Sequence, residues 1–221
     1  MSSIVKALPK HRLVLSAVDW RNYGRLLHIL ADRRAIRVTY DGGTLEIMTL
    51  SHEHESLGYL LARLIDALTE ELSIPVKGGG STTFRYRKRR RGLEPDSCWW
   101  INSEPLVRGK HHIDLRTDPP PDLALEVDIT RSSLNRLKIY AALGIPEVWR
   151  LQRGKITCHV LGEDERYSTS SMSRVITGMQ PAELMRFLAW QGQMDETGIV
   201  REFRAWVREQ RSAGRLGEPN P

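Results

Sequence analysis

The sequence has few cysteines and no long apolar run. Cys98 and Cys158 are its two cysteines, and neither belongs to a Cys-x-x-Cys or Cys/His ligand pattern. A zinc module and a disulfide scaffold are therefore disfavoured. No segment approaches the roughly 18 apolar residues that a membrane span needs, and the basic N-terminal segment does not resemble a signal peptide. We therefore expect a cytoplasmic protein that has no membrane partner.

Apolar residues are nevertheless abundant enough for a core. Of the 221 residues 40% are hydrophobic, which excludes wholesale disorder, and this length favours one domain. We predict a single domain over residues 16–210, between flexible segments at 1–15 and 211–221. Lysine and arginine total 33 against 27 acidic residues, a net charge of +6. This excess is compatible with a polyanionic partner, although many ordinary proteins carry one.

The periodicity of apolar residues predicts a mixture of hairpins and helices. A Ser16–Asp19 capping box would begin the first helix, and Ser51 would cap the second. We expect helices over 16–33, 51–72, 131–144, 181–190 and 195–210, with strands over 36–40, 45–47, 81–87, 93–101, 122–130, 147–152 and 155–161. Hairpins combined with one strand–helix–strand crossover indicate an α/β protein of the α+β type, with one mixed central β-sheet flanked by helices.

Acidic residues recur on two of these strands. Side chains alternate between the faces of a strand, so Glu126 and Asp128 share the face opposite the apolar Leu123–Ile129 set. Glu94 and Asp96 share a face of the earlier strand in the same way. If the strands are neighbours, the carboxylates converge, and a hard divalent cation such as Mg²⁺ would offset their repulsion. Alternatively these side chains are simply solvated, and Asp128 caps the exit toward the next helix.

Two basic features accompany the acids. Lys138 lies beside the apolar stripe of the 131–144 helix, where it could orient a water or stabilise a phosphorus oxygen, or its stem could merely pack on the helix flank. The turn formed by Arg87, Lys88, Arg89, Arg90 and Arg91 could contact nucleic-acid phosphates that flank the reacting one. The alternative is a solvated hairpin tip.

These stretches carry a family resemblance. The segments SHEHE, GLEPD, DLALEVDIT and SSLNRLKIYAALGIPEVW occur in the order typical of the Uma-type (Uma-two) restriction endonucleases. This family is a branch of the PD-(D/E)xK nuclease superfamily. The resemblance extends from about Asp19 to about Trp206 and implies a restriction-endonuclease-like fold.

The resemblance also implies a set of site residues. Asp96 and Glu126 correspond to the family's metal ligands, for Mg²⁺ or Mn²⁺. Asp128 stands where the superfamily has its lysine, so the resemblance transfers that role to Lys138. Glu53 and His54 lie where a first-helix acid would fall, and either could enter the site or only favour the helix N-terminus.

The implied reaction is metal-dependent hydrolysis of DNA phosphodiester bonds. A homodimer would place two symmetric sites on a duplex. Two alternatives remain open at this stage. Asp128, together with Asn135 where an aspartate is common, favours a protein that binds nucleic acid without cutting it. The other alternative is a dimeric interaction module whose charges only maintain solubility.

Overall fold

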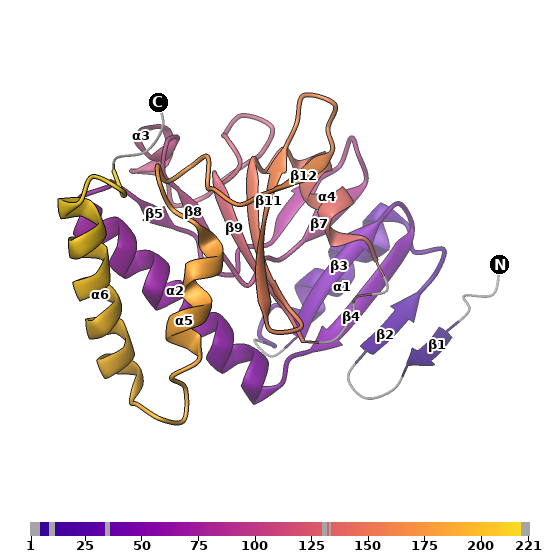
Figure 1. The fold of residues 1–221 in the computed structure, drawn as a ribbon. Coiled ribbons are helices and arrows are strands. Elements are labelled where there is room, and N and C mark those ends of the chain that lie inside the picture. The colour runs from indigo at the N-terminus through magenta and orange to yellow at the C-terminus, as the bar shows by residue number, and fades with distance from the viewer. Residues whose placement is uncertain (1–4, 9–11, 34–35, 130–131, 133, 218–221) are drawn as a thin grey trace.

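The computed structural model describes residues 5–8, 12–33, 36–129, 132 and 134–217. Within these residues, twelve strands form two six-stranded sheets, with helices packed against them (Figure 1). This mixed architecture confirms the predicted fold class, although the strands are divided between two sheets where one was expected. Residues 1–4, 9–11 and 218–221 of the segments predicted to be flexible lie outside the described residues.

The first sheet has the strand order β1-β2-β4-β3-β7-β6. Its strands are β1 (Val5–Leu8), β2 (Arg12–Leu15), β3 (Ile36–Asp41), β4 (Thr44–Thr49), β6 (Phe84–Tyr86) and β7 (Arg91–Leu93). All their pairings are antiparallel. Two of these strands, β1 and β2, lie within the segment predicted to be flexible.

The second sheet has the order β12-β11-β10-β9-β8-β5. Its strands are β5 (Lys77–Gly78), β8 (Ser97–Trp100), β9 (Leu123–Asp128), β10 (Glu147–Gln152), β11 (Lys155–Leu161) and β12 (Tyr167–Ser170). The β9–β10 pair is parallel and is joined by a crossover through a helix, as predicted.

The helices are α1 (Trp20–Leu30), α2 (His52–Leu72), α3 (Glu104–Val107), α4 (Arg136–Leu143), η1 (Pro181–Glu183), α5 (Leu184–Leu188) and α6 (Glu196–Ser212). The Ser51 hydroxyl caps α2 as predicted, whereas α1 is capped by Asp19 itself and not by Ser16. Among the described residues no helix is long and apolar enough to cross a membrane.

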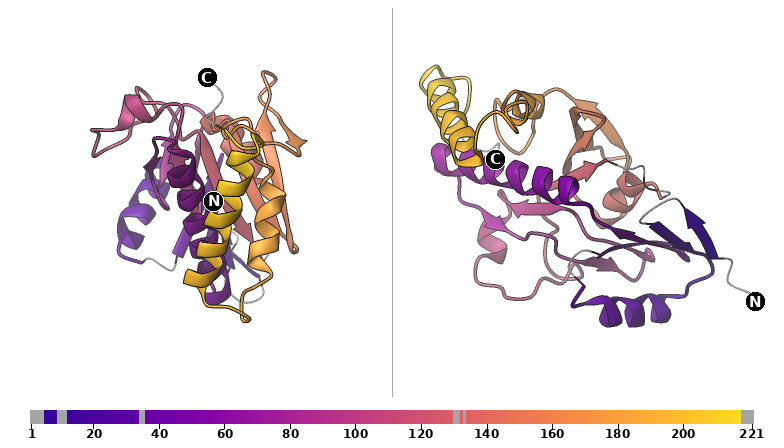
Figure 2. Two further views of the ribbon diagram at one scale, coloured as in Figure 1. Left: turned by 60° about the vertical axis from the view of Figure 1, so that its left-hand side comes forward. Right: turned by 90° about the horizontal axis from the view of Figure 1, so that it is seen from below.

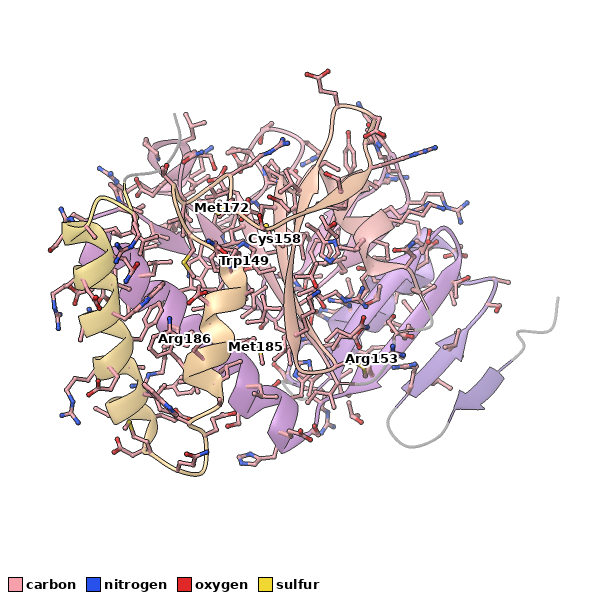
Figure 3. The ribbon with its side chains drawn as sticks, in the orientation of Figure 1. Trp149, Arg153, Cys158, Met172, Met185 and Arg186 are labelled. Atoms are coloured by element: carbon pink, nitrogen blue, oxygen red, sulfur yellow. The ribbon has the colours of Figure 1, made fainter. Side chains whose placement is uncertain are left out.

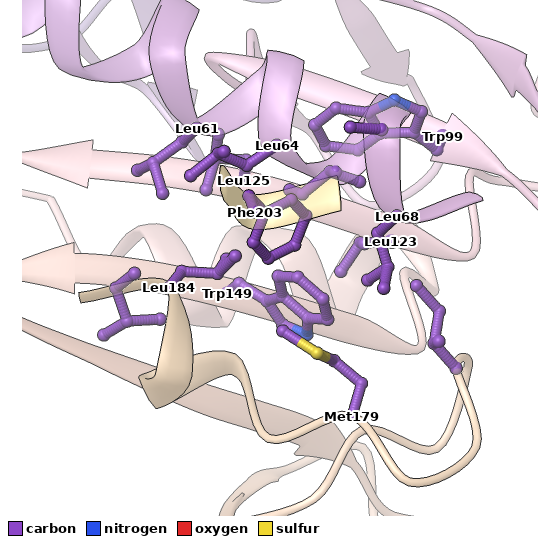
Figure 4. Close-up of a cluster of buried hydrophobic side chains, with 14 of the residues drawn as sticks. Leu61, Leu64, Leu68, Trp99, Leu123, Leu125, Trp149, Met179, Leu184 and Phe203 are labelled. Atoms are coloured by element: carbon purple, nitrogen blue, oxygen red, sulfur yellow. The ribbon is translucent and has the colours of Figure 1, made fainter. Parts of the chain in front are cut away.

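The largest core lies between α2, α5, α6 and one face of the second sheet (Figures 1 and 2). Leu64 and Leu68 of α2 meet Leu125 of β9, while Trp149 and Phe203 fill the space toward α6 (Figure 4). Helix α6 continues to Ser212, and Leu216 is buried in this core. Part of the predicted C-terminal tail therefore belongs to the folded domain.

The other face of β9 is buried as well. Ala124 packs with Ile139 and Tyr140 of α4 in a second cluster. The face that carries Glu126 is therefore not solvated, and the interpretation of these acids as a solvent-exposed face is wrong for Glu126, which is 5% exposed. Ile129, expected to lie on the apolar face, is instead 42% exposed.

The chain passes from one sheet to the other at Glu94-Pro95-Asp96. Strand β7 ends at Leu93 in the first sheet, and β8 begins at Ser97 in the second. Proline has no N–H to donate to a strand ladder, so it favours this interruption. The continuous strand predicted over 93–101 is therefore two strands, and its acids lie at the junction of the sheets.

The two cysteines are buried free thiols. Cys98 lies on β8, and Cys158 lies on β11 near Trp149 (Figure 3). Burial raises the pKa of both thiols, Cys98 to about 12. High pKa values leave little thiolate near neutral pH, so both residues act as apolar core groups.

Candidate functional site

Asp96 and Glu126 come together at the junction of the sheets. Strands β8 and β9 are antiparallel neighbours, and the pairing extends to Asp96, whose N–H donates to the Leu125 carbonyl at 3.1 Å. One carboxylate oxygen of Asp96, Oδ2, accepts from the Val127 N–H at 2.7 Å. Asp96 is therefore anchored to the peptide unit that follows Glu126, and the two predicted acids share one location.

Glu126 is held by a buried cation. Arg136 donates from Nε to Oε2 at 2.9 Å and from Nη2 to Oε1 at 2.5 Å, and the Tyr140 hydroxyl also donates to Oε1. Burial raises the pKa of Glu126 and outweighs the opposing effect of Arg136, while the charge of Asp96 raises it further. The bidentate geometry is the arrangement that best offsets the desolvation of a carboxylate.

Arg136 also joins the two sheets. Its Nη1 donates to Thr39 Oγ1 on β3 at 2.7 Å, and its Nη2 donates to the Glu94 carbonyl at 2.7 Å. Burial is the largest single influence and lowers the pKa of Arg136, but the charge and hydrogen bonds of Glu126, together with Tyr140 and Asp96, outweigh it, so the net pKa is raised. This arginine therefore remains a cation at the centre of the acid pair.

His54 contacts Asp96 from the first turn of α2. Its Nε2 lies 3.4 Å from Asp96 Oδ2, and its buried Nδ1 has no hydrogen-bond partner among the described residues; the nearest acid is Glu55, at 3.8 Å. Burial lowers the pKa of His54, but the hydrogen bond and charge of Asp96 raise it more. Of the two residues predicted as accessory on this helix, His54 reaches the acids.

Arg37 on β3 lies among three carboxylates. Its guanidinium nitrogens are 4.0 Å from Asp96 Oδ1, 4.0 Å from Glu94 Oε2 and 3.9 Å from Glu55 Oε1. Glu94 also accepts from the Thr83 hydroxyl at 2.6 Å, and burial raises its pKa. Glu94, a predicted accessory acid, therefore lies beside the cluster, with its backbone carbonyl on Arg136 and its carboxylate toward Arg37.

The other predicted accessory acids lie apart from this cluster. Asp128 pairs with Arg150 and accepts from Gln152 Nε2 at 2.7 Å, both on the neighbouring strand β10. Glu53 is exposed and borders a pocket together with Asp128. Asp128 thus stabilises the β9–β10 pair, and the N-cap of α4 is Asn135.

Lys138 lies on a different side of α4 from Arg136. It is exposed, and it lines a cavity of about 760 Å³ together with Arg166 and Tyr167 of the β11–β12 hairpin. The buried side of α4 is formed by Ile139, Tyr140 and Leu143, which places Arg136 inward. The cation beside the acids is therefore Arg136, which the sequence analysis did not select. Its position three and four residues before Ile139 and Tyr140 favours the inward side, but Leu137 defines a competing apolar stripe, so this pattern alone did not single Arg136 out.

The basic turn between β6 and β7 is largely engaged in local contacts. Arg89 pairs with Glu165, Arg91 pairs with Asp41 at 2.8 Å, and Arg90 lies 3.3 Å from the Tyr40 hydroxyl. Arg87 and Lys88 are exposed at the tip. Within the described residues, Arg87 and Lys88 are therefore the basic side chains of the turn that have the fewest contacts with the rest of the protein.

The paired acids Asp96 and Glu126 offer carboxylate oxygens of the kind that bind a divalent metal ion. No group of three or more His, Cys, Asp or Glu residues is arranged as a metal-ligand set in the described part of the chain. Mg²⁺ needs only one or two carboxylates when substrate oxygens and water complete its shell. Asp96 and Glu126 are ligands of that kind, so the residues fit such an ion once Arg136 releases Glu126. Arg136 occupies the two oxygens of Glu126 that an ion would use.

The mixed α/β architecture, with two multi-stranded sheets flanked by helices, is that of a restriction-endonuclease-like fold. The family model Uma2, described as "Putative restriction endonuclease", matches residues 20–190, and the chain belongs to this family. No curated protein matches the sequence. Family membership indicates a nuclease, and restriction-endonuclease-like enzymes generally use a divalent metal ion.

Proposed function

We propose that this protein is an endonuclease that hydrolyses DNA phosphodiester bonds with Mg²⁺ or Mn²⁺. The observation that carries the proposal is the meeting of Asp96 and Glu126, from adjacent strands, beside the buried guanidinium of Arg136. Paired carboxylates next to a fixed cation are suited to a reaction in which negative charge develops on phosphate oxygens.

Asp96 and Glu126 are the residues that would hold the ion. When bound, such an ion polarises the phosphate and lowers the pKa of a coordinated water. The hydrogen bond from Val127 orients Asp96, and His54 Nε2 lies 3.4 Å from Asp96 Oδ2. We assign the cationic role to Arg136 in preference to Lys138, because only Arg136 contacts Glu126.

This assignment requires that Arg136 releases the carboxylate of Glu126 when that carboxylate binds the ion. Arg136 keeps donors on Thr39 and on the Glu94 carbonyl, so these contacts can hold it in the site when Glu126 takes a different partner. A guanidinium retained there would stabilise the charge that develops on the substrate.

The proposal is tested by cleavage of supercoiled plasmid and labelled duplex DNA in Mg²⁺, in Mn²⁺ and in EDTA. We expect Asp96→Asn and Glu126→Gln to lower the cleavage rate by at least 100-fold. Glu163→Gln, an exposed carboxylate on the β11–β12 loop, serves as the charge-matched control and should cleave at the parent rate. Cleavage by Asp96→Asn equal to that of the parent would refute the proposal.

A second function, nucleic-acid binding without cleavage, is favoured by one observation. Both oxygens of Glu126 are already occupied by Arg136, which excludes an ion from them in this arrangement. This alternative predicts a DNA mobility shift with no cleavage in any divalent metal. The plasmid assay and the mobility shift together separate the two functions.

We also propose a cytoplasmic homodimer that acts on both strands of a duplex. The two buried free thiols suit a reducing compartment. Light scattering coupled to size-exclusion chromatography tests the dimer, for which a mass near twice 25.3 kDa is expected.

A further inference from the structure

A groove leads away from the acid cluster between α1, β3 and the segment before β6. Its volume is about 790 Å³, within the range of ligand-binding sites. Arg37, Glu55 and Glu94 line part of it, and Arg37, which lies beside both of these acids, is 4.0 Å from Asp96 Oδ1. The groove therefore opens directly onto the proposed active site.

Cations lie along the outer part of this groove. Arg33 and Arg85 line it and are exposed, together with His28. Among the residues that the structure describes, neither Arg33 nor Arg85 forms an ion pair with a carboxylate. Their charges are therefore available to a ligand, unlike those of Arg89 and Arg91, which pair with acids of the protein.

Arg85 is held in place by aromatic rings. Its guanidinium carbon lies 5.2 Å from the Trp20 ring centre and 5.3 Å from that of Tyr23. Its Nη2 also lies over Gly24 of α1, where an added Cβ would come within 3.0 Å. Cation–π contacts of this kind restrict the side chain, so less entropy is lost when a ligand binds.

Apolar side chains form part of the groove. Leu27, Leu30, Ile36 and Val38 contribute to a lining that is polar over its larger part. A mainly polar groove that carries positive charges beside apolar patches suits a ligand that alternates phosphates with weakly polar sugar and base surfaces. A small carboxylate or a free phosphate would use only one of the cations.

We infer that this groove binds the phosphate backbone of a polynucleotide strand on its way to the acid pair, with Arg33 and Arg85 neutralising two flanking phosphates. The inference rests on the proposed function for the identity of the polymer. It assigns backbone binding to Arg33, which follows α1, and to Arg85 on β6, and not to the basic turn at 87–91.

The test measures binding without catalysis. Fluorescence anisotropy with labelled single-stranded DNA, duplex DNA and RNA is recorded in EDTA over a range of salt concentrations. We expect R33Q/R85Q to weaken binding about tenfold. Each neutralised phosphate contributes about 0.7 to 0.9 to the magnitude of the slope of log K against log salt, so the loss of two contacts should reduce that magnitude by about 1.4 to 1.8. R33K/R85K, which keeps both charges, should retain most of that slope.

The matched control is R186Q/R201Q, which removes two charges from α5 and α6. Arg186 lies on the side of the molecule away from α1 and β3 (Figures 1 and 3), and this variant should keep the parent slope. A second comparison is R87Q/K88Q at the hairpin tip, which should change the slope less than R33Q/R85Q does. Melting temperatures near the parent value confirm that each variant is folded.

The outcomes separate the groove from the proposed activity. An unchanged slope in R33Q/R85Q, or no polynucleotide binding by the parent at low salt, overturns the inference. If the parent cleaves but binds through another surface, the groove assignment fails and the nuclease proposal stands. If R33Q/R85Q loses binding while the parent cleaves nothing, the groove stands and the nuclease proposal fails.

Discussion

Arg136, the first residue of α4, donates to both carboxylate oxygens of Glu126, ten residues earlier on β9. The same side chain reaches Thr39 in the other sheet. One guanidinium thus neutralises the most buried acid of the site and also connects the two sheets. The structural role and the proposed catalytic role therefore fall on the same residue, and experiments must separate them.

Substitutions at Arg136 and Lys138 should have very different effects. Arg136→Gln leaves Glu126 buried without its cation and should cost about 3–5 kcal/mol in unfolding free energy. Lys138→Gln changes an exposed side chain and should stay within about 0.5 kcal/mol of the parent. Urea denaturation followed by circular dichroism measures both values.

The conservative variant Arg136→Lys keeps the charge and loses the bidentate geometry. We expect it to fold, with stability between those of the parent and Arg136→Gln, and to cleave at least tenfold more slowly than the parent. Cleavage that depends on Lys138 and not on Arg136 would contradict the assignment of the cationic role.

Tyr140→Phe should weaken the support of Glu126 without removing its cation. The hydroxyl donates to Glu126 Oε1 in a buried position. Loss of one hydrogen bond to a charged group should cost about 1.5–3 kcal/mol. Thermal and urea unfolding provide the measurement, and a variant as stable as the parent would show that the contact contributes nothing.

Gly92 on β7 is predicted to tolerate no side chain. A Cβ there would lie 2.2 Å from Tyr23 Oη, so Gly92→Ala should destabilise the fold by about 1–3 kcal/mol. The Tyr23 hydroxyl is buried and has no hydrogen-bond partner among the described residues, so Tyr23→Phe alone should be neutral or stabilising. The double variant Gly92→Ala/Tyr23→Phe should recover part of the stability that Gly92→Ala loses. If the two single changes in unfolding free energy simply add, the clash between the Cβ and the Tyr23 hydroxyl is not the cause.

Glu71 should make the packing of α6 on α2 dependent on pH. It accepts from Arg204 at 3.1 Å and from Arg208 at 2.9 Å. Burial is the largest single influence and raises its pKa, but the hydrogen bonds and charges of the two arginines together outweigh it and lower the pKa below the ordinary value of 4.5. The pairing therefore contributes fully above about pH 5 and is lost as the pH falls below 4.5 through the folded-state pKa.

The variant Glu71→Gln tests this dependence. We expect it to be less stable than the parent by about 0.5–1 kcal/mol at pH 7, because exposed pairs are screened by solvent. The two proteins should converge in acid. A stability difference between the parent and Glu71→Gln that grows as the pH falls would contradict this prediction.

Local sequence patterns were sufficient for much of the fold. The Ser51 cap, the wide leucine stripe of α2 and the Gly-rich turn between β3 and β4 each determine their element through neighbouring residues alone. The pairing of Asp96 with Glu126 also followed from the alternation of strand side chains together with the family resemblance.

The division into two sheets could not be predicted in this way. Residues 93–101 have the alternation of one strand, and only the partners of β7 and β8 decide that they belong to different sheets. Helix α4 raised a similar difficulty because apolar residues occur around much of its surface. Leu137 and Ile139 both qualify as core residues, so the pattern could not decide whether Arg136 or Lys138 points inward.

The hydrogen bond from the Val127 N–H to Asp96 has a consequence for heat inactivation. Because Asp96 is tied to the backbone beside Glu126, the two acids cannot separate unless β8 and β9 part. Loss of any activity that needs both acids should therefore coincide with melting of the central sheet, and a heated sample should contain fully active molecules and unfolded ones with few in between.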